Sequence, residues 1–140
     1  MKENNMEKAL YPNGTVNGSV RLLLRLEGLA VLAAATLLYA HMQFSWVYFA
    51  LLFLTPDVFM IGYTLNKHAG AHLYNFGHSY TTALLLAGIG FTLQHDAIVA
   101  ASIIWVAHIG FDRCVGYDLK YTDSFKHTHL SAPLQQAENS

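Results

Sequence analysis

The amino-acid sequence predicts an all-α integral membrane protein, a bundle of four transmembrane helices with both termini in the cytoplasm. Hydrophobic residues make up 54% of the 140 residues and charged residues only 12%, which is about half of the charged share usual in soluble domains. Four apolar segments are each near the length of about 17–25 residues that a helix needs to cross a bilayer. All eight Lys and Arg residues agree with one orientation of these segments.

The chain is expected to form one domain with a polar extension at each end. Residues 1–20 are expected to be a flexible arm, because they lack the apolar stretch of a cleaved signal peptide. Residues 21–130 are expected to form the transmembrane domain, and the polar residues 131–140 a disordered tail. The domain includes an interfacial segment in which Tyr117, Tyr121 and Phe125 recur every four residues, as in a short amphipathic helix.

The four predicted spans run from about Arg21 to Ala40, Ser45 to Tyr63, Ser79 to Leu93 and Ala97 to Gly116. Because the hydrocarbon core offers the backbone no water, helices are the form expected for segments of this kind. A soluble bundle would need polar residues at helical spacing, and the runs LAVLAAATLLYA and WVYFALLFL have none. Pro56 removes one intrahelical hydrogen bond, so we expect a kink in the second span that frees the carbonyl of Leu52.

The basic residues predict the orientation. They open the first span, separate the second from the third, or end and follow the fourth: Lys2, Lys8, Arg21, Arg25, Lys67, Arg113, Lys120 and Lys126. The positive-inside rule therefore places both termini and a longer His-rich loop, residues 64–77, in the cytoplasm of a multi-pass cell-membrane protein. The two outer connections are short, so the first and second spans, and the third and fourth, form antiparallel hairpins.

Ionisable side chains gather at the cytoplasmic side. Asp57 follows Pro56, His78 ends the loop, and His108 and Asp112 share one helix face because they are four residues apart. Carboxylates are costly inside a bilayer and repel one another unless something neutralises them. A divalent cation would do so, and mixed His and carboxylate ligands suit zinc, manganese or iron. The pattern predicts a metal site, although each side chain could instead serve helix packing or capping.

Two residues are candidates for the general base of a metal-dependent reaction: Glu27, inside the first span, and His72, in the loop. Glu27 could equally pair with an arginine, and His72, four residues after His68, could be an interfacial polar residue. Lys67 and Arg113 are candidates to offset the charge of a substrate phosphate.

Four motifs lie in a distinctive order: Leu26-Glu27-Gly28, HAGAHLYNFGHSY in the loop, AHIGFDRCVGYDLKY from the fourth span onward, and FKHTHL. In order and spacing they resemble a small, functionally uncharacterised family of bacterial four-helix integral membrane proteins. The resemblance covers roughly residues 25–130. That family tends to have glycine after THL, where this chain has Ser131.

A second pattern concerns chemistry. Pro-Asp ends one span, His-Ser begins the next, and His-x-x-x-Asp lies in a later span, an order similar to that of the membrane-bound predicted metal-dependent hydrolases. The resemblance implies metal ligands at Asp57, His78, His108 and Asp112. The loop departs from that family, which carries His-Arg-Gly before its Thr-His-Ser, and His72 lies one residue further from His78 than the pattern requires.

Three functions are compatible with these observations. The first is a metal-dependent hydrolase acting on a phosphoester in a lipid-linked or phosphorylated membrane-proximal substrate. The second is a non-enzymatic module that binds or passes a proton, an ion or a small solute, which would call for a homo-oligomer. The third is an assembly protein whose small residues, such as Gly88 and Gly90, allow close helix contact. The bilayer is the expected partner, and a chain without a basic tract is not expected to bind nucleic acid.

Overall fold

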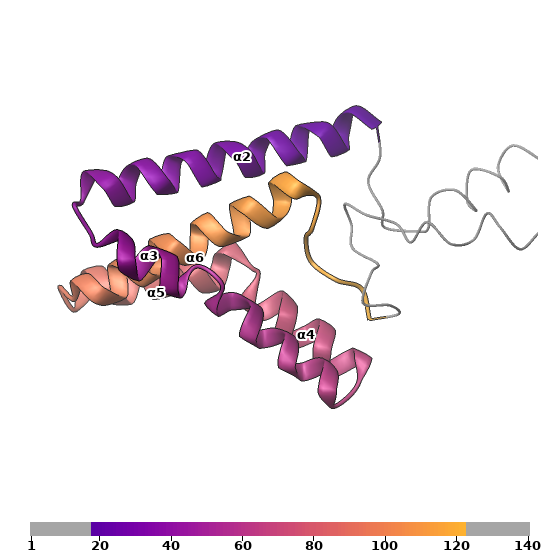
Figure 1. Cartoon of the computed structure of the whole chain (residues 1–140). Helices are drawn as coiled ribbons and strands as arrows, with labels where there is room; N and C mark the ends of the chain where they lie inside the picture. The colour runs from indigo at the N-terminus through magenta and orange to yellow at the C-terminus, as the bar shows by residue number, and fades with distance from the viewer. Residues whose placement is uncertain (1–17, 123–140) are drawn as a thin grey trace, which may run out of the picture.

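The computed structural model describes residues 18–122, which form an all-helical structure (Figure 1). Most of the predicted N-terminal arm, and the predicted tail, lie outside the described residues. The elements in chain order are α2 (Gly18–His41), α3 (Trp46–Leu52), the 3₁₀ helix η1 (Thr55–Thr64), α4 (Lys67–Gly77), α5 (Tyr80–Thr92) and α6 (Asp96–Val115).

Three segments of the described chain are long and apolar enough to cross a membrane: Gly18–His41, Trp46–Thr64 and Asp96–Val115. They correspond to the first, second and fourth predicted spans and indicate a membrane protein. The third predicted span corresponds to α5, whose 13 residues extend for about 20 Å. The number of crossings and the side on which the termini lie stay predictions.

Helix α6 is the centre of the structure. Half of its apolar stretch is buried, against 17% for α2. Helix α2 packs along one side of α6 and α5 along another (Figure 1). The core between α2 and α6 contains Tyr39, which is fully buried and whose hydroxyl donates to the carbonyl of Ser45 at 2.6 Å. This bond fixes the short connection from α2 to α3.

Two glycines let the backbones of α2 and α6 come close together. A Cβ atom on Gly28 would lie 2.7 Å from the amide nitrogen of Cys114, and one on Gly110 would lie 2.8 Å from the amide nitrogen of Leu32. Both positions therefore exclude any side chain. Gly88, one of the small residues expected to allow close contact, instead faces open space.

The second predicted span changes helix type at Pro56. Helix α3 ends at Leu52, and the chain continues as η1, with Pro56 in its first turn. Pro56 has no N–H to offer the Leu52 carbonyl, so the α-helical pattern stops there. The amide of Asp57 bonds to the Leu54 carbonyl at 3.1 Å, three residues back, as a 3₁₀ helix requires. The predicted kink is thus a change of helix type.

The prediction of a long cytoplasmic loop over residues 64–77 is wrong for most of that segment, because residues 67–77 form α4. The side chain of Asn66 caps this helix by accepting from the Ala69 amide at 2.8 Å. Helix α4 folds back along η1, and Gly70 and Gly77 lie directly against the rings of Tyr63 and Phe59. The resulting η1–α4 hairpin extends away from α2 and α6 in Figure 1.

The chain after α6 also differs from the prediction. Gly116, at a φ of +100°, ends α6, and the Tyr117 amide bonds back to the Asp112 carbonyl at 2.8 Å. Residues 117–122 are not helical, so the predicted amphipathic helix is absent from this part, and Phe125 lies outside the described residues. The segment is instead held against α4 by Asn75, whose side chain donates to the Lys120 carbonyl at 2.9 Å and accepts from its amide at 2.6 Å.

We expect Gly28→Ala to lower the stability of the protein by about 1–3 kcal/mol, because the added methyl group must push α2 away from α6. The measurement is thermal unfolding of the full chain in detergent. Gly88→Ala is the matched control. It adds the same methyl group to an apolar helix, but in open space, and should leave stability unchanged or raise it by about 0.5–1 kcal/mol. Equal effects of the two substitutions would contradict the close packing at Gly28.

Candidate metal centre

Four side chains from three parts of the chain meet beside α6. Asp57 lies in the first turn of η1, and His78 follows the last residue of α4. His108 and Asp112 stand one turn apart on α6. Each side chain offers one ligand atom, and all four ligand atoms lie within 4.8 Å of one another. The structure thus brings together the four residues predicted as metal ligands, and ligation itself stays a prediction.

Five of the six distances between these ligand atoms are nearly equal. Nε2 of His78 lies 3.3 Å from Oδ1 of Asp57 and 3.4 Å from Oδ2 of Asp112. Nε2 of His108 lies 3.5 Å and 3.4 Å from the same two oxygens, and 3.2 Å from Nε2 of His78. Five of the six distances therefore fall between 3.2 and 3.5 Å. The sixth distance, between the two carboxylate oxygens, is no more than 4.8 Å, so the four atoms outline a small tetrahedron.

The tautomer of His78 is set by a backbone bond. Its Nδ1 lies 2.9 Å from the Tyr74 carbonyl, which accepts only, so Nδ1 carries the proton and donates. Nε2 of His78 then presents a lone pair to the centre of the tetrahedron. A histidine that donates its second N–H to a backbone carbonyl in this way is typical of metal ligands. The Tyr74 ring also stacks on the His78 ring at 3.8 Å and 11°, which fixes the orientation of the imidazole.

The second imidazole creates an electrostatic requirement. Nε2 of His108 faces Nε2 of His78 at 3.2 Å. Two lone pairs at this distance repel, so a proton or a metal ion must lie between them. The two nearby carboxylates add further negative charge, which a cation would offset. Phe53 packs edge-on against the His108 ring at 5.4 Å and shields it on the side of α3.

The centre is buried but not closed. The side chains of His78 and His108 are 2% and 1% exposed, and that of Asp112 is 15% exposed. The side chain of Asp57 is 40% exposed. Water or a small substrate would therefore approach along the Asp57 edge.

Several residues that the sequence analysis did not select support the centre. The Tyr74 hydroxyl lies 3.5 Å from Oδ2 of Asp112, and burial, followed by the charges of Asp112 and Asp57, raises the pKa of Tyr74 above its ordinary value. Tyr74 therefore keeps its proton, and its hydroxyl can donate a hydrogen bond to the Asp112 carboxylate. Trp105 of α6 donates to the Gly77 carbonyl at 2.5 Å and so holds the end of α4 beside α6. The i, i+4 spacing of Tyr74 and His78 was the available sequence signal.

Lys120 lies behind Tyr74. Its ammonium group is 4.4 Å from the centroid of the Tyr74 ring, and the residue is only 8% exposed. Burial lowers the pKa of Lys120 to about 8, and the carboxylates of Asp112 and Asp57 oppose this shift. The ammonium group of Lys120 thus lies beside the Tyr74 ring, which in turn stacks on the ring of His78.

The other predicted site residues lie elsewhere. Glu27 and His72 are exposed and do not belong to the tetrahedron, so the geometry gives no support to their predicted role as general base. Lys67 is exposed at the start of α4. Arg113 has its Nε 3.2 Å from Oδ2 of Asp118, and its guanidinium stacks over the Tyr80 ring at 4.2 Å. Their role in binding phosphate stays a prediction.

We expect Lys120→Met to flatten the dependence of stability on pH. In the wild type, folded Lys120 releases its proton near pH 8, whereas the unfolded chain keeps it to about pH 10.4. Because the unfolded state binds more protons in this window, wild-type stability should gain an increment as pH rises from about 8 to 10, and the variant should lack it. The measurement is unfolding in detergent at several pH values. Lys67→Met, at an exposed lysine, should keep the wild-type slope, and identical slopes in all three proteins would contradict the burial of Lys120.

Comparison with known proteins shows the family to which the chain belongs. The chain matches no curated protein and no solved structure. Residues 21–132, which include every helix of the described chain except the first turn of α2, match one family description. The chain therefore belongs to the family described as Domain of unknown function (DUF4260).

Proposed function

We propose that the protein is a membrane metalloprotein that holds one divalent transition metal ion between Asp57, His78, His108 and Asp112. We further propose that it uses the ion to hydrolyse a phosphoester bond in a lipid-linked or other membrane-proximal substrate. The observation that carries the proposal is the tetrahedron of ligand atoms, with five edges of 3.2–3.5 Å.

A tetrahedron of two imidazoles and two carboxylates favours zinc, because manganese usually takes six oxygen ligands in an octahedron and non-haem iron usually takes two imidazoles and one carboxylate. Zinc bonds to His nitrogen and carboxylate oxygen are about 2.0–2.2 Å long, which in a tetrahedron gives distances of about 3.3–3.6 Å between ligand atoms. Five of the six edges, at 3.2–3.5 Å, lie close to this value. Magnesium prefers six oxygen ligands in an octahedron and keeps several waters, which suits a centre with two imidazoles poorly.

Hydrolysis requires an open coordination position for water or substrate, and four protein ligands fill a tetrahedral site completely. Four protein ligands are typical of structural zinc sites, whereas catalytic sites keep a place for water or substrate. The exposed Asp57 edge is where the coordination could expand to five. A bound metal ion would polarise the phosphoryl group and lower the pKa of a coordinated water to about 7. The Asp57 carboxylate, the most exposed of the four ligands, would accept the proton that this water loses on the oxygen that does not bind the metal ion.

A proton could take the place of the metal ion between the facing imidazoles. The four residues would then form a proton relay, as in the alternative of a module that binds or passes protons, ions or small solutes. The metal content of the protein distinguishes the two accounts, because only the first requires an ion that co-purifies and reloads.

We expect the detergent-purified full chain to contain about one equivalent of transition metal per chain, measured by inductively coupled plasma mass spectrometry after growth with added zinc and manganese. Asp57→Asn, His78→Ala and Asp112→Asn should each lower this content at least tenfold, the range seen when a ligand or its supporting bond is lost. His72→Ala removes an exposed histidine from the same hairpin and should keep the wild-type metal content. The proposal would be overturned, and the proton relay favoured, if the wild type were metal-free, took up neither zinc nor manganese, and unfolded at the same temperature with and without added metal.

We expect hydrolysis of bis(4-nitrophenyl) phosphate by the metal-loaded protein to rise with pH through about 7, as the coordinated water ionises. Treatment with a chelator should abolish the activity, and restoring zinc should return it. Asp57→Asn should lower the rate about 10²-fold or more. A protein that binds one equivalent of metal but hydrolyses no phosphoester would retain the metal site and overturn the enzymatic part of the proposal.

A further inference from the structure

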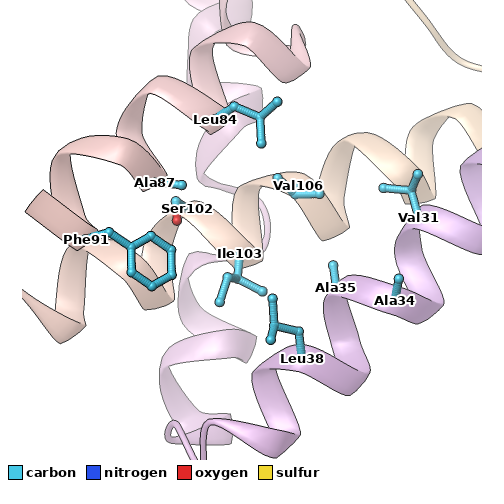
Figure 2. A pocket seen from close by; sticks show the side chains of 10 residues that line it. All are labelled: Val31, Ala34, Ala35, Leu38, Leu84, Ala87, Phe91, Ser102, Ile103 and Val106. Atoms are coloured by element: carbon cyan, nitrogen blue, oxygen red, sulfur yellow. The ribbon is translucent and has the colours of Figure 1, made fainter.

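An apolar groove lies on the face of α6 opposite the metal centre. Ile103 and Val106 form part of its floor (Figure 2), and at 100° per residue they point away from His108 and Asp112. Helices α2 and α5 form the two walls. They both pack on α6 but not along each other, so the space between them, about 350 Å³, stays open.

The groove presents only hydrocarbon. Its single polar lining residue is Ser102, and the Ser102 hydroxyl already donates to the Val99 carbonyl at 2.7 Å. The wall residues Leu38, Leu84 and Phe91 are 46%, 62% and 60% exposed, so the groove opens on the outer surface of the apolar helices. In a bilayer this surface meets lipid chains rather than water.

The groove leads toward a cluster of charges at one end of the bundle. Moving one or two helical turns from the lining residues Leu84 and Val106 reaches Tyr80 on α5 and Arg113 on α6. The Arg113 guanidinium stacks over the Tyr80 ring at 4.2 Å. The distance along α6 from Val106 to Arg113 is about 10 Å, which leaves room for a glycerol backbone between an acyl chain and a phosphate.

The arginines of α2 lie at the same end. Arg25 donates from Nε to the Cys114 carbonyl at 2.8 Å, and a side-chain nitrogen of Arg21 would lie 3.8 Å from a Cβ atom on Gly116. Nε of Arg21 is buried and has no hydrogen-bond partner among the described residues. Arg113 is paired with the carboxylate of Asp118 at 3.2 Å, whereas Arg21 and Arg25 form no ion pair with a carboxylate of the described residues, so these two guanidinium groups add positive charge at the end of the groove.

We infer that this groove binds the acyl chain of an anionic phospholipid, whose phosphate is held by Arg21 and Arg113. The apolar lining of the groove fits an acyl chain. The positive charge at its end, together with the unpartnered Nε of Arg21, fits an anionic headgroup. A helix from a second copy is a poorer fit, because a helix is about 10 Å wide with its side chains and the charged end would have no partner on an apolar helix. The inference is independent of the proposed metal function, since the two sites lie on opposite faces of α6.

Native mass spectrometry of the full chain tests this directly. The protein would be reconstituted into mixed micelles with equal amounts of phosphatidylglycerol and phosphatidylcholine that carry the same acyl chains. We expect one phospholipid to stay bound per chain, with phosphatidylglycerol preferred about tenfold. Equal retention of the two lipids by the wild type would overturn the headgroup assignment.

Two variants separate the binding of the lipid headgroup from the binding of the acyl chain. Arg21→Gln should reduce the preference for phosphatidylglycerol to about twofold or less while lipid still binds. Ala87→Phe fills the groove and should reduce retention of both lipids at least fivefold. Lys67→Gln, at a basic residue in the η1–α4 hairpin, and Leu37→Phe, at a 70% exposed position of α2 that does not line the groove, are the matched controls and should leave both quantities unchanged.

The same spectra contain the outcomes that contradict the inference. Equal losses of preference in Arg21→Gln and Lys67→Gln would show a general attraction of anionic lipid to positive charge rather than a site. Lipid-free dimers that Ala87→Phe dissociates would identify the groove as a contact between two copies of the chain. Circular dichroism of each variant would establish that the helices are retained.

Discussion

The arrangement depends on gathering four polar side chains in apolar surroundings. Two carboxylates and two imidazoles whose ligand atoms lie within 4.8 Å of one another carry a large desolvation cost, and their mutual repulsion adds to it. A cation at their centre changes the sign of this balance, because each ligand then gains an attraction in a medium of low dielectric. The η1–α4 hairpin, the Trp105 bond and the end of α6 all serve to hold these four groups in one place.

The η1–α4 hairpin brings two of the four side chains together within a short stretch of the sequence. Asp57 and His78 lie 21 residues apart, yet the fold-back of α4 along η1 brings them to 3.3 Å. Glycine contacts along the hairpin let the backbones approach closely, and the bond from Trp105 to the Gly77 carbonyl ties the hairpin to α6. The ligands on α6 need no such device, because the helix itself sets His108 and Asp112 one turn apart. The hairpin is thereby attached to the central helix at the position where the chemistry is proposed.

Much of this could be predicted from the sequence, for identifiable reasons. The apolar runs predict helices by length and composition alone, and the His108–Asp112 pair follows from helical spacing. Asp57 and His78 are predictable as polar residues beside the ends of apolar segments. The helical state of residues 67–77 was missed because the segment was assigned as the connection between two apolar spans, although Asn66 is a good N-cap residue. The position of Glu27 could not be predicted, since it depends on how α2 is rotated against α6. The contact between Asn75 and Lys120 could not be predicted, because it joins segments that are 45 residues apart in the sequence.

The 3₁₀ form of η1 has a geometrical consequence. A 3₁₀ helix rises about 2.0 Å per residue and an α-helix about 1.5 Å, so the ten residues of η1 span about 20 Å instead of about 15 Å. The adjacent α4, with eleven residues, is about 16 Å long. Rewinding η1 into an α-helix would shorten it by about 5 Å and rotate Asp57 about the helix axis. The helix type of η1 therefore sets the direction in which the Asp57 side chain points, and with it the distance from Asp57 to the other three ligands.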